Sequence, residues 1–171
     1  MEYRNIVLVG MMGTGKSSVG QALASRLNWV YEDTDAAIER AQGMSITRMF
    51  AELGEPFFRK AESETIERTL QGRHQVVATG GGAVLAEQNR ILMKRSGLVV
   101  VLKASAETII ERVRSDQSRP LLQGGVEDRV RHIMESRKHA YDFADLHVDT
   151  DGKTVGQIVD EICSRLERER A

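Results

Sequence analysis

Short apolar runs alternate along the chain with segments in which apolar residues recur every three or four positions. The runs predict strands at residues 6–9, 29–31, 76–79, 98–102 and 146–148. The periodic segments predict helices near 16–27, 35–42, 45–53, 56–70, 86–95, 105–114, 124–140 and 154–168. Val99, Val100 and Val101 form an uninterrupted apolar run, which is typical of a strand buried on both sides. Strands that alternate with helices predict an α/β fold with a parallel sheet covered on both faces.

Length, charge and composition argue against several classes of protein but do not identify the function. A length of 171 residues predicts one domain spanning residues 1–171, and a net charge of −1 with mixed acids and bases argues against a nucleic-acid partner. No apolar stretch approaches the roughly 18 residues that a membrane helix needs, and no signal peptide is recognised at the start of the chain. We therefore expect a cytoplasmic protein without a membrane partner. Cys163 is the only cysteine, so an internal disulfide is excluded and a small buried apolar residue is expected there.

The strongest motif directly follows the first predicted strand. Residues 10–17 read GMMGTGKS, a complete G-x-x-x-x-G-K-[ST] phosphate loop with a strand before it and a helix after it. Glycines allow backbone N–H groups to face a phosphate, and the next helix presents its positive end to the same charge. Lys16 is predicted to reach the β- and γ-phosphates, and Ser17 to place its hydroxyl on Mg²⁺. The alternative is a glycine-rich turn without a ligand, and the full motif in its proper context argues against it.

Two carboxylates, Asp33 and Asp35, follow the second predicted strand. Their spacing places both on one side of an extended chain. The third strand ends without an acidic residue, so Asp33 is the best candidate to hold Mg²⁺, usually through water. Asp35 would then face an acceptor hydroxyl and accept its hydrogen bond or its proton. In the alternative reading, Asp35 or Thr34 caps the helix that follows, and the two roles are compatible.

Arg59 lies close to the predicted start of a helix that has Pro56 in its first turn. The helix dipole disfavours a cation there, which suggests that the guanidinium faces a negative group. Glu62, three residues further on, can hold it in place. The sequence leaves open whether Arg59 forms only a surface ion pair or grips the carboxylate of a ligand with two parallel hydrogen bonds.

Three further features lie at predicted loops and helix ends. Residues 80–82 are glycines, which allow close approach to a ligand or serve a tight connection. Arg119 lies in a loop before the paired glycines 124–125, so it either swings over a transferring phosphate or belongs to an ordinary exposed loop. Arg137 lies toward the end of the next predicted helix, where the dipole favours a cation for structural reasons alone.

Taken together, these residues resemble the shikimate kinase family over nearly the whole chain. The order and spacing of the shared marks, rather than any one of them, carry the likeness. The marks are the GMMGTGKSS loop, residues 33–35, Phe58-Arg59 with Glu62, glycines 80–82, residues 119–122, and Arg137 with Tyr141.

The resemblance implies a five-stranded parallel sheet of the phosphate-loop type, related to nucleoside monophosphate kinases, with a mobile lid at about residues 113–125. It also implies a substrate-binding segment at about residues 33–62. The implied reaction is transfer of a phosphate from ATP, with Mg²⁺, to the 3-hydroxyl of shikimate, on the route to chorismate and aromatic amino acids. A monomer is expected.

The same resemblance assigns roles to individual residues. ATP would contact the phosphate loop and two arginines: Gly13, Thr14, Gly15, Lys16, Ser17, Ser18, Arg112 and Arg119. Shikimate would contact Asp35, the presumed base, together with Arg59, Gly81, Gly82 and Arg137. Ser17 would ligate Mg²⁺, with Asp33 holding it through water, and Lys16, Asp35 and Arg119 would be the catalytic set.

The chain differs from the family pattern at one position, and two other functions are compatible with part of its sequence. The family commonly has a proline two residues after the second substrate arginine, where this chain has His139, so the helix is expected to continue past Arg137. A gluconate kinase shares the loop and the sheet but not the D-T-D triplet, the F-R-x-x-E pattern or the three glycines. A nucleotide-sensing module without catalysis would not need every catalytic residue that the chain retains.

Overall fold

The computed structural model describes residues 3–115 and 125–171. Its strands are β1 (Asn5–Val9), β2 (Val30–Asp33), β3 (Gln75–Ala78), β4 (Gly97–Lys103) and β5 (Leu146–Asp149). Its longer helices are α1 (Lys16–Leu27), α2 (Thr34–Gln42), α4 (Glu55–Thr69), α5 (Glu87–Ser96), α6 (Ala106–Arg114), α7 (Val126–Ser136) and α8 (Val155–Arg170). Short helical segments are α3 (Ile46–Arg48), the π-helical turn η1 (Met49–Leu53) and the 3-10 turn η2 (Ala83–Leu85).

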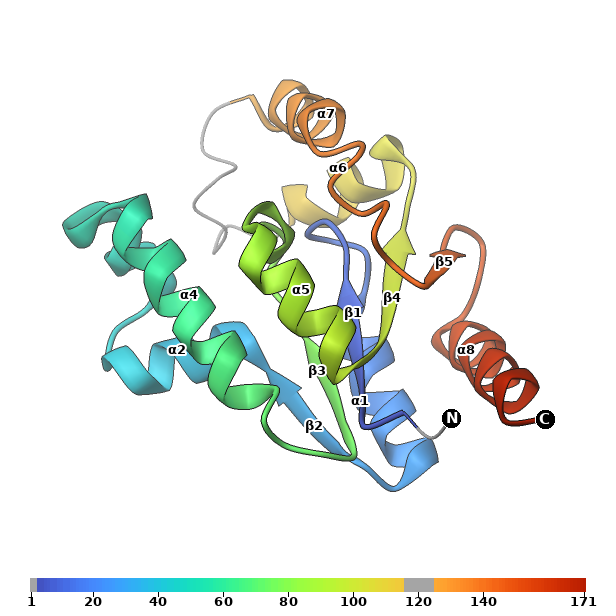
Figure 1. Cartoon of the computed structure of the whole chain (residues 1–171). Helices are drawn as coiled ribbons and strands as arrows, with labels where there is room; N and C mark the ends of the chain where they lie inside the picture. The colour runs from blue at the N-terminus through green and yellow to red at the C-terminus, as the bar shows by residue number, and fades with distance from the viewer. Residues whose placement is uncertain (1–2, 116–124) are drawn as a thin grey trace.

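The five strands form one parallel sheet in the order β2-β3-β1-β4-β5 (Figure 1). The predicted five-stranded parallel sheet is therefore confirmed. Since all strands run the same way, their carboxyl ends lie at one edge, where ligands of such sheets bind. The register places Asp33 at the end of β2 level with Ala78 at the end of β3, and Ala78 level with Leu8 of β1.

Side chains of the central strands alternate between two hydrophobic cores. Val7 and Val9 of β1 belong to a core that also receives residues of α4, α5, α6 and α7. Ile6 and Leu8 belong to a second core that receives residues of α1 and α8. Helices thus cover both faces of the sheet, because apolar side chains on both sides of β1 must be removed from water.

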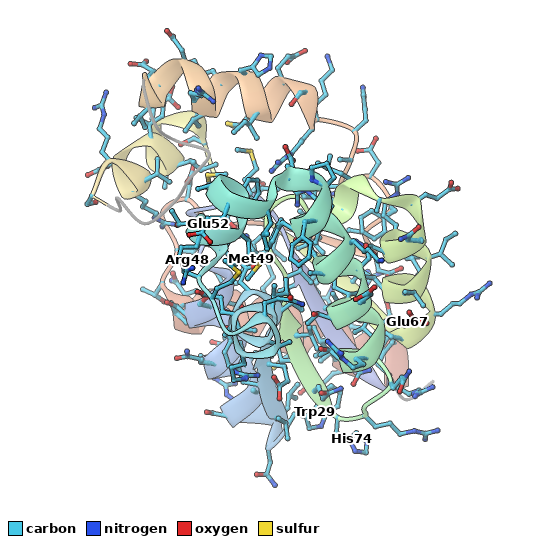
Figure 2. All side chains as sticks on the ribbon, turned by 90° about the vertical axis from the view of Figure 1, so that its left-hand side faces the viewer. Trp29, Arg48, Met49, Glu52, Glu67 and His74 are labelled. Carbon is cyan, nitrogen blue, oxygen red and sulfur yellow. The ribbon has the colours of Figure 1, made fainter. Side chains whose placement is uncertain are left out.

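A third, smaller core holds the segment that follows β2. Ile38 of α2, Met49 of η1 and Phe58 of α4 are buried together, and the Phe50 ring packs against Phe58 at a tilt of 40° and a centroid distance of 4.9 Å. In Figure 2, Met49 is labelled beside Arg48 and Glu52, two exposed residues of the same segment that form an ion pair. The core fixes α2 against α4 outside the main sheet, and α4 itself reaches back to the sheet through Ile66.

Two predicted helices differ from the observed ones. The helix expected over residues 45–53 is one α-helical turn followed by the π-helical turn η1, a local widening that residue propensities do not reveal. The helix expected over 124–140 begins at Val126 and ends at Ser136, with turns from residues 137 to 143. Among the described residues, no helix combines the length and the apolar character needed to span a membrane.

Candidate active site

A cavity of about 470 Å³ lies at the edge of the sheet where the strands end. Its walls come from the segments that follow β1, β2, β3 and β5, together with one residue of α6. The lining residues are Gly13, Thr14, Gly15, Lys16, Ser17, Ser18, Val19, Asp33, Asp35, Ala78, Thr79, Gly80, Gly81, Arg112, Thr150, Lys153, Val155 and Ile158. The phosphate loop and both carboxylates that were singled out in the sequence therefore share one cavity.

The phosphate loop is held open by its own hydrogen bonds. Gly15 precedes α1 with a φ of 89°, a left-handed conformation that favours glycine. The Lys16 ammonium donates to the carbonyl oxygens of Gly10 at 2.6 Å and Met11 at 2.8 Å. The buried Thr14 hydroxyl donates to the Met11 carbonyl at 2.7 Å. These bonds fix the shape of the loop at the start of α1, whose positive end can receive an anion.

Arg112 of α6 reaches across to this loop. Its guanidinium donates to the Gly13 carbonyl at 2.6 Å, although the side chain is exposed. This contact holds an arginine plane at the rim of the cavity. Arg119 and most of the expected lid, residues 116–124, lie outside the described part of the chain.

Asp33 and Asp35 are placed differently from the expectation of two residues on one extended strand. Asp33 ends β2, whereas Asp35 is already in the first turn of α2. Asp33 is itself the N-cap: its Oδ1 accepts from the backbone N–H groups of Asp35 at 2.9 Å and Ala36 at 3.3 Å. The capping role assigned to Asp35 or Thr34 was therefore wrong. The cap fixes the orientation of the Asp33 carboxylate at the cavity wall.

Arg59 is held by two acidic residues of its own helix. One Nη donates to Glu62 at 2.9 Å, as the three-residue spacing predicted, and the other donates to Glu55 at 3.3 Å. Glu62 is buried, and this burial raises its pKa above the usual glutamate value, whereas Arg59 opposes the shift. Burying a carboxylate in this way is costly without a cation beside it.

Glycines 80–82 leave room for charged side chains. A Cβ on Gly80 would lie 2.8 Å from Asp35 Oδ1, and a Cβ on Gly82 would lie 2.5 Å from both terminal nitrogens of Arg59. None of the three has a positive φ, so space rather than backbone conformation requires glycine here. The sequence suggested that these glycines allow a ligand to approach closely. In the structure they also make room for side chains of the protein itself.

Arg137 comes to the same place from the other side. It is buried directly after α7, and a Cβ on Gly81 would lie 3.5 Å from its Nη1. Nη1 is buried and has no hydrogen-bond partner within the described residues. Tyr141 donates to the Gly81 carbonyl at 3.1 Å, which ties the turn after α7 to the glycines. The helix thus ends before Arg137 without a proline at position 139, and the expectation of a continued helix was wrong.

Arg59 and Arg137 stand behind the cavity wall rather than on its lining. Arg59 borders a groove between α4 and α5, and Arg137 borders a small cavity of about 190 Å³ beneath the phosphate loop. Both guanidinium groups point toward the glycine run, which itself lies beside Met12 of the loop. Gly82 is buried and contacts Arg59, whereas Gly81 faces the cavity.

Thr150 and Lys153 line the cavity but were not identified in the sequence analysis. They follow β5, so the rule that ligands gather beyond strand ends would have found them had it been applied to the fifth strand as well as the first four. Lys153 forms an ion pair with Glu161 at 2.8 Å, and Thr150 donates to the Lys103 carbonyl at 2.8 Å. These contacts order the last wall of the cavity.

Ser17 and Asp33 present oxygen atoms to the cavity close to the loop. A serine hydroxyl and a carboxylate are hard oxygen donors of the kind that Mg²⁺ binds together with phosphate oxygens and water. The donor set at this position therefore fits Mg²⁺.

Comparisons with known proteins point to one family. The family model described as "Shikimate kinase" matches residues 12–167. A shikimate kinase of Geobacter sulfurreducens is 48% identical over 163 residues, which cover 94% of this chain and 90% of that protein.

Solved structures agree with the sequence match. A shikimate kinase from Acinetobacter baumannii, solved in complex with shikimate, superposes with a TM-score of 0.94 at 33% identity, covering 98% of this chain and 94% of that one. A gluconokinase from Sinorhizobium meliloti reaches a TM-score of 0.65 at 21% identity, covering 96% of this chain and 92% of that one, a likeness of fold alone.

Proposed function

The chain belongs to the shikimate kinase family, and from that membership we propose how its residues transfer the γ-phosphate of ATP to the 3-hydroxyl of shikimate. It is an ATP-dependent kinase with shikimate as its acceptor. The proposal concerns the residues that bind each substrate, the metal ion and the proton transfer.

The phosphate loop holds ATP. Backbone N–H groups of residues 13–18 receive the phosphates at the start of α1, and Lys16 exchanges its loop carbonyls for β- and γ-phosphate oxygens. The Arg112 guanidinium stacks on the adenine at the rim of the cavity, where its hydrogen bond to the Gly13 carbonyl already holds it in place. Arg119 contacts the transferring phosphate from the lid.

Ser17 and Asp33 would hold Mg²⁺, Ser17 directly and Asp33 through water. A bound ion would supply positive charge that offsets the charge of the phosphates. Support comes from the oxygen donors at this position and from the two N–H groups that fix the Asp33 carboxylate.

Shikimate lies between the phosphate loop and the glycine run. Arg59 and Arg137 bind its carboxylate, and the buried, unsatisfied Nη1 of Arg137 supports this role because such a donor is costly without an acceptor. Gly81 faces the cavity and lets the ring approach closely, and Gly82 contributes by making room for Arg59. Asp35 accepts the hydrogen bond of the reacting hydroxyl and takes its proton as phosphate transfer proceeds.

Little covalent chemistry is required of the protein in phosphoryl transfer, so positioning and charge stabilisation dominate. Orientation of two reactants can supply roughly 7–11 kcal/mol of a barrier. One observation carries the proposal: a single cavity of about 470 Å³ joins the phosphate loop to Asp35 and to Gly80 and Gly81.

We propose that the protein acts as a monomer, as the family resemblance leads us to expect. Its need for ATP and Mg²⁺ favours the cytoplasm as its compartment. The proposed unit is the single domain of residues 1–171, with the acceptor held by the segment 33–62.

A coupled assay with Mg·ATP and a panel of acceptors tests the proposal. Turnover with shikimate is expected, and little or none with gluconate. Turnover with gluconate alone would favour the rival kinase, and nucleotide binding without any turnover would favour a sensing module. Replacing shikimate by its analogue without the carboxylate should raise KM most strongly, because two arginines would lose their partner.

A further inference from the structure

Tyr31 lies on the same strand as the proposed metal-binding residue Asp33, and no role has been assigned to its side chain. On β2 it is two residues before Asp33, and alternate residues of a strand point to the same face of the sheet. Its ring packs against α1, where a Cβ on Gly20 would lie 2.6 Å from Tyr31 Cε2. Gly20 therefore leaves room for the Tyr31 ring against the helix that begins with Lys16 and Ser17.

The Tyr31 hydroxyl is a buried polar group for which a hydrogen-bond partner is expected. Its oxygen is buried and has no hydrogen bond of normal geometry among the described residues, and the side chains of Ser17 and Asp33 lie close enough to influence its pKa. A tyrosine hydroxyl can both donate and accept a hydrogen bond. A buried hydroxyl without partners costs free energy, and a phenylalanine would fill the same space without that cost.

A Ser17 hydroxyl that binds magnesium would require a hydrogen-bond acceptor for its own hydrogen. A serine hydroxyl that offers a lone pair to a cation must send its hydrogen elsewhere, and hydrogen bonds of this kind orient the groups that touch a metal. A second hydroxyl beside Ser17 could accept this hydrogen and donate its own hydrogen to a carboxylate. Both hydroxyl groups would then have hydrogen-bond partners. Tyr31 is the residue of β2 that offers such a hydroxyl.

We propose that Tyr31 is a positioning residue that links Ser17 to Asp33 when the metal–nucleotide complex binds. Its oxygen accepts the hydrogen of the Ser17 hydroxyl, and its own hydrogen is donated to the Asp33 carboxylate. The lone pairs of Ser17 then face the metal, and Asp33 is held for the metal-bound water. This inference rests on the proposed roles of Ser17 and Asp33.

Tyr31→Phe removes the hydroxyl and retains the ring that packs on Gly20. The test measures Mn²⁺ binding, as a stand-in for Mg²⁺, by electron paramagnetic resonance of free Mn²⁺, with enzyme in excess so that all ADP is bound. The affinity of the enzyme–ADP complex for Mn²⁺ should fall about tenfold, a typical cost of losing a partner behind a metal ligand. The affinity for ADP in EDTA, measured by calorimetry, should be unchanged.

Tyr3→Phe is the matched control, because the Tyr3 hydroxyl donates to Glu169 in the last turn of α8, whereas only the first turn of α8 lines the cavity. It should leave Mn²⁺ affinity unchanged. Equal Mn²⁺ affinity in Tyr31→Phe and the natural protein would overturn the inference, as would a parallel loss of ADP affinity in EDTA, which indicates a structural role. If the natural protein held Mn²⁺ no more tightly with ADP than without it, the proposed metal site itself would fail, and Tyr31 with it.

Discussion

The phosphate-loop half of the cavity is built around one contiguous stretch of chain, whereas the acceptor half depends on side chains of separate elements. Residues 13–18 line the first half together with Arg112 and residues after β5, and hydrogen bonds among residues 10–16 fix the shape of the loop. The second half is lined by Asp35 of α2 and by Gly80 and Gly81 after β3, and Arg59 and Arg137 stand behind this wall.

The two halves differ in how much they depend on the rest of the fold. The loop requires only a strand before it and a helix after it. The acceptor half requires α2, α4 and the turn after α7 to converge on three residues without side chains. Substitutions in the acceptor half should therefore disturb recognition and chemistry while nucleotide affinity is preserved.

The strongest test of this separation is Asp35→Asn. Loss of the proposed base should lower kcat by about 10²–10⁴-fold, the usual contribution of a positioned proton acceptor. Nucleotide affinity, measured by calorimetry with ADP, should stay close to that of the natural protein. A parallel loss of ADP affinity would show that the two halves are not separable, and unchanged kcat would remove Asp35 from the mechanism.

Arg59→Ala should have the next largest effect, on the acceptor alone. Loss of a charged hydrogen-bond donor to the carboxylate should raise the KM for shikimate roughly 10- to 100-fold and leave the KM for ATP nearly unchanged. The matched control is Arg48→Ala, because Arg48 also pairs with an acid of its own segment, Glu52, but is exposed (Figure 2). Equal changes in the two KM values of Arg59→Ala would argue against carboxylate recognition.

The smallest expected effect concerns stability and pH at Glu62. Its pKa is raised in the folded protein, chiefly by burial, so the folded state holds this proton more tightly than the unfolded state. Its contribution to stability is complete below the usual glutamate pKa and is lost as pH rises through the folded value.

Urea unfolding of Glu62→Gln and the natural protein across this pH range measures that contribution. Relative to the variant, the natural protein should lose stability as the pH rises above the usual glutamate pKa, and the loss should be small because Arg59 offsets part of the burial cost. A difference between the two proteins that is independent of pH would contradict the raised pKa. A relative gain in stability with pH would reverse its sign.

The sequence predicted the sheet and the phosphate loop because both depend on local patterns. Apolar runs gave all five strands, and the loop motif is contiguous. The capping role of Asp33 was missed, because strand and helix meet within the D-T-D triplet and periodicity does not locate such a boundary.

Contacts between distant elements were harder to predict. Tyr141 ties its turn to Gly81, sixty residues away along the chain, and this contact accompanies the end of α7 without a proline. The space required by Arg59 at Gly82 likewise depends on the packing of α4. Only the folded arrangement shows that these glycines make room for guanidinium groups.

The position of β1 in the sheet has a consequence for how the molecule opens. It is hydrogen-bonded on both sides, by β3 and β4, and all five of its residues are buried, whereas β2 lies at the edge. Amide hydrogens of a doubly flanked strand exchange with solvent only when the whole domain unfolds, whereas peripheral elements open in smaller excursions. The phosphate loop thus follows a central, fully buried strand, whereas the segment after β2 follows an edge strand and is expected to open more readily.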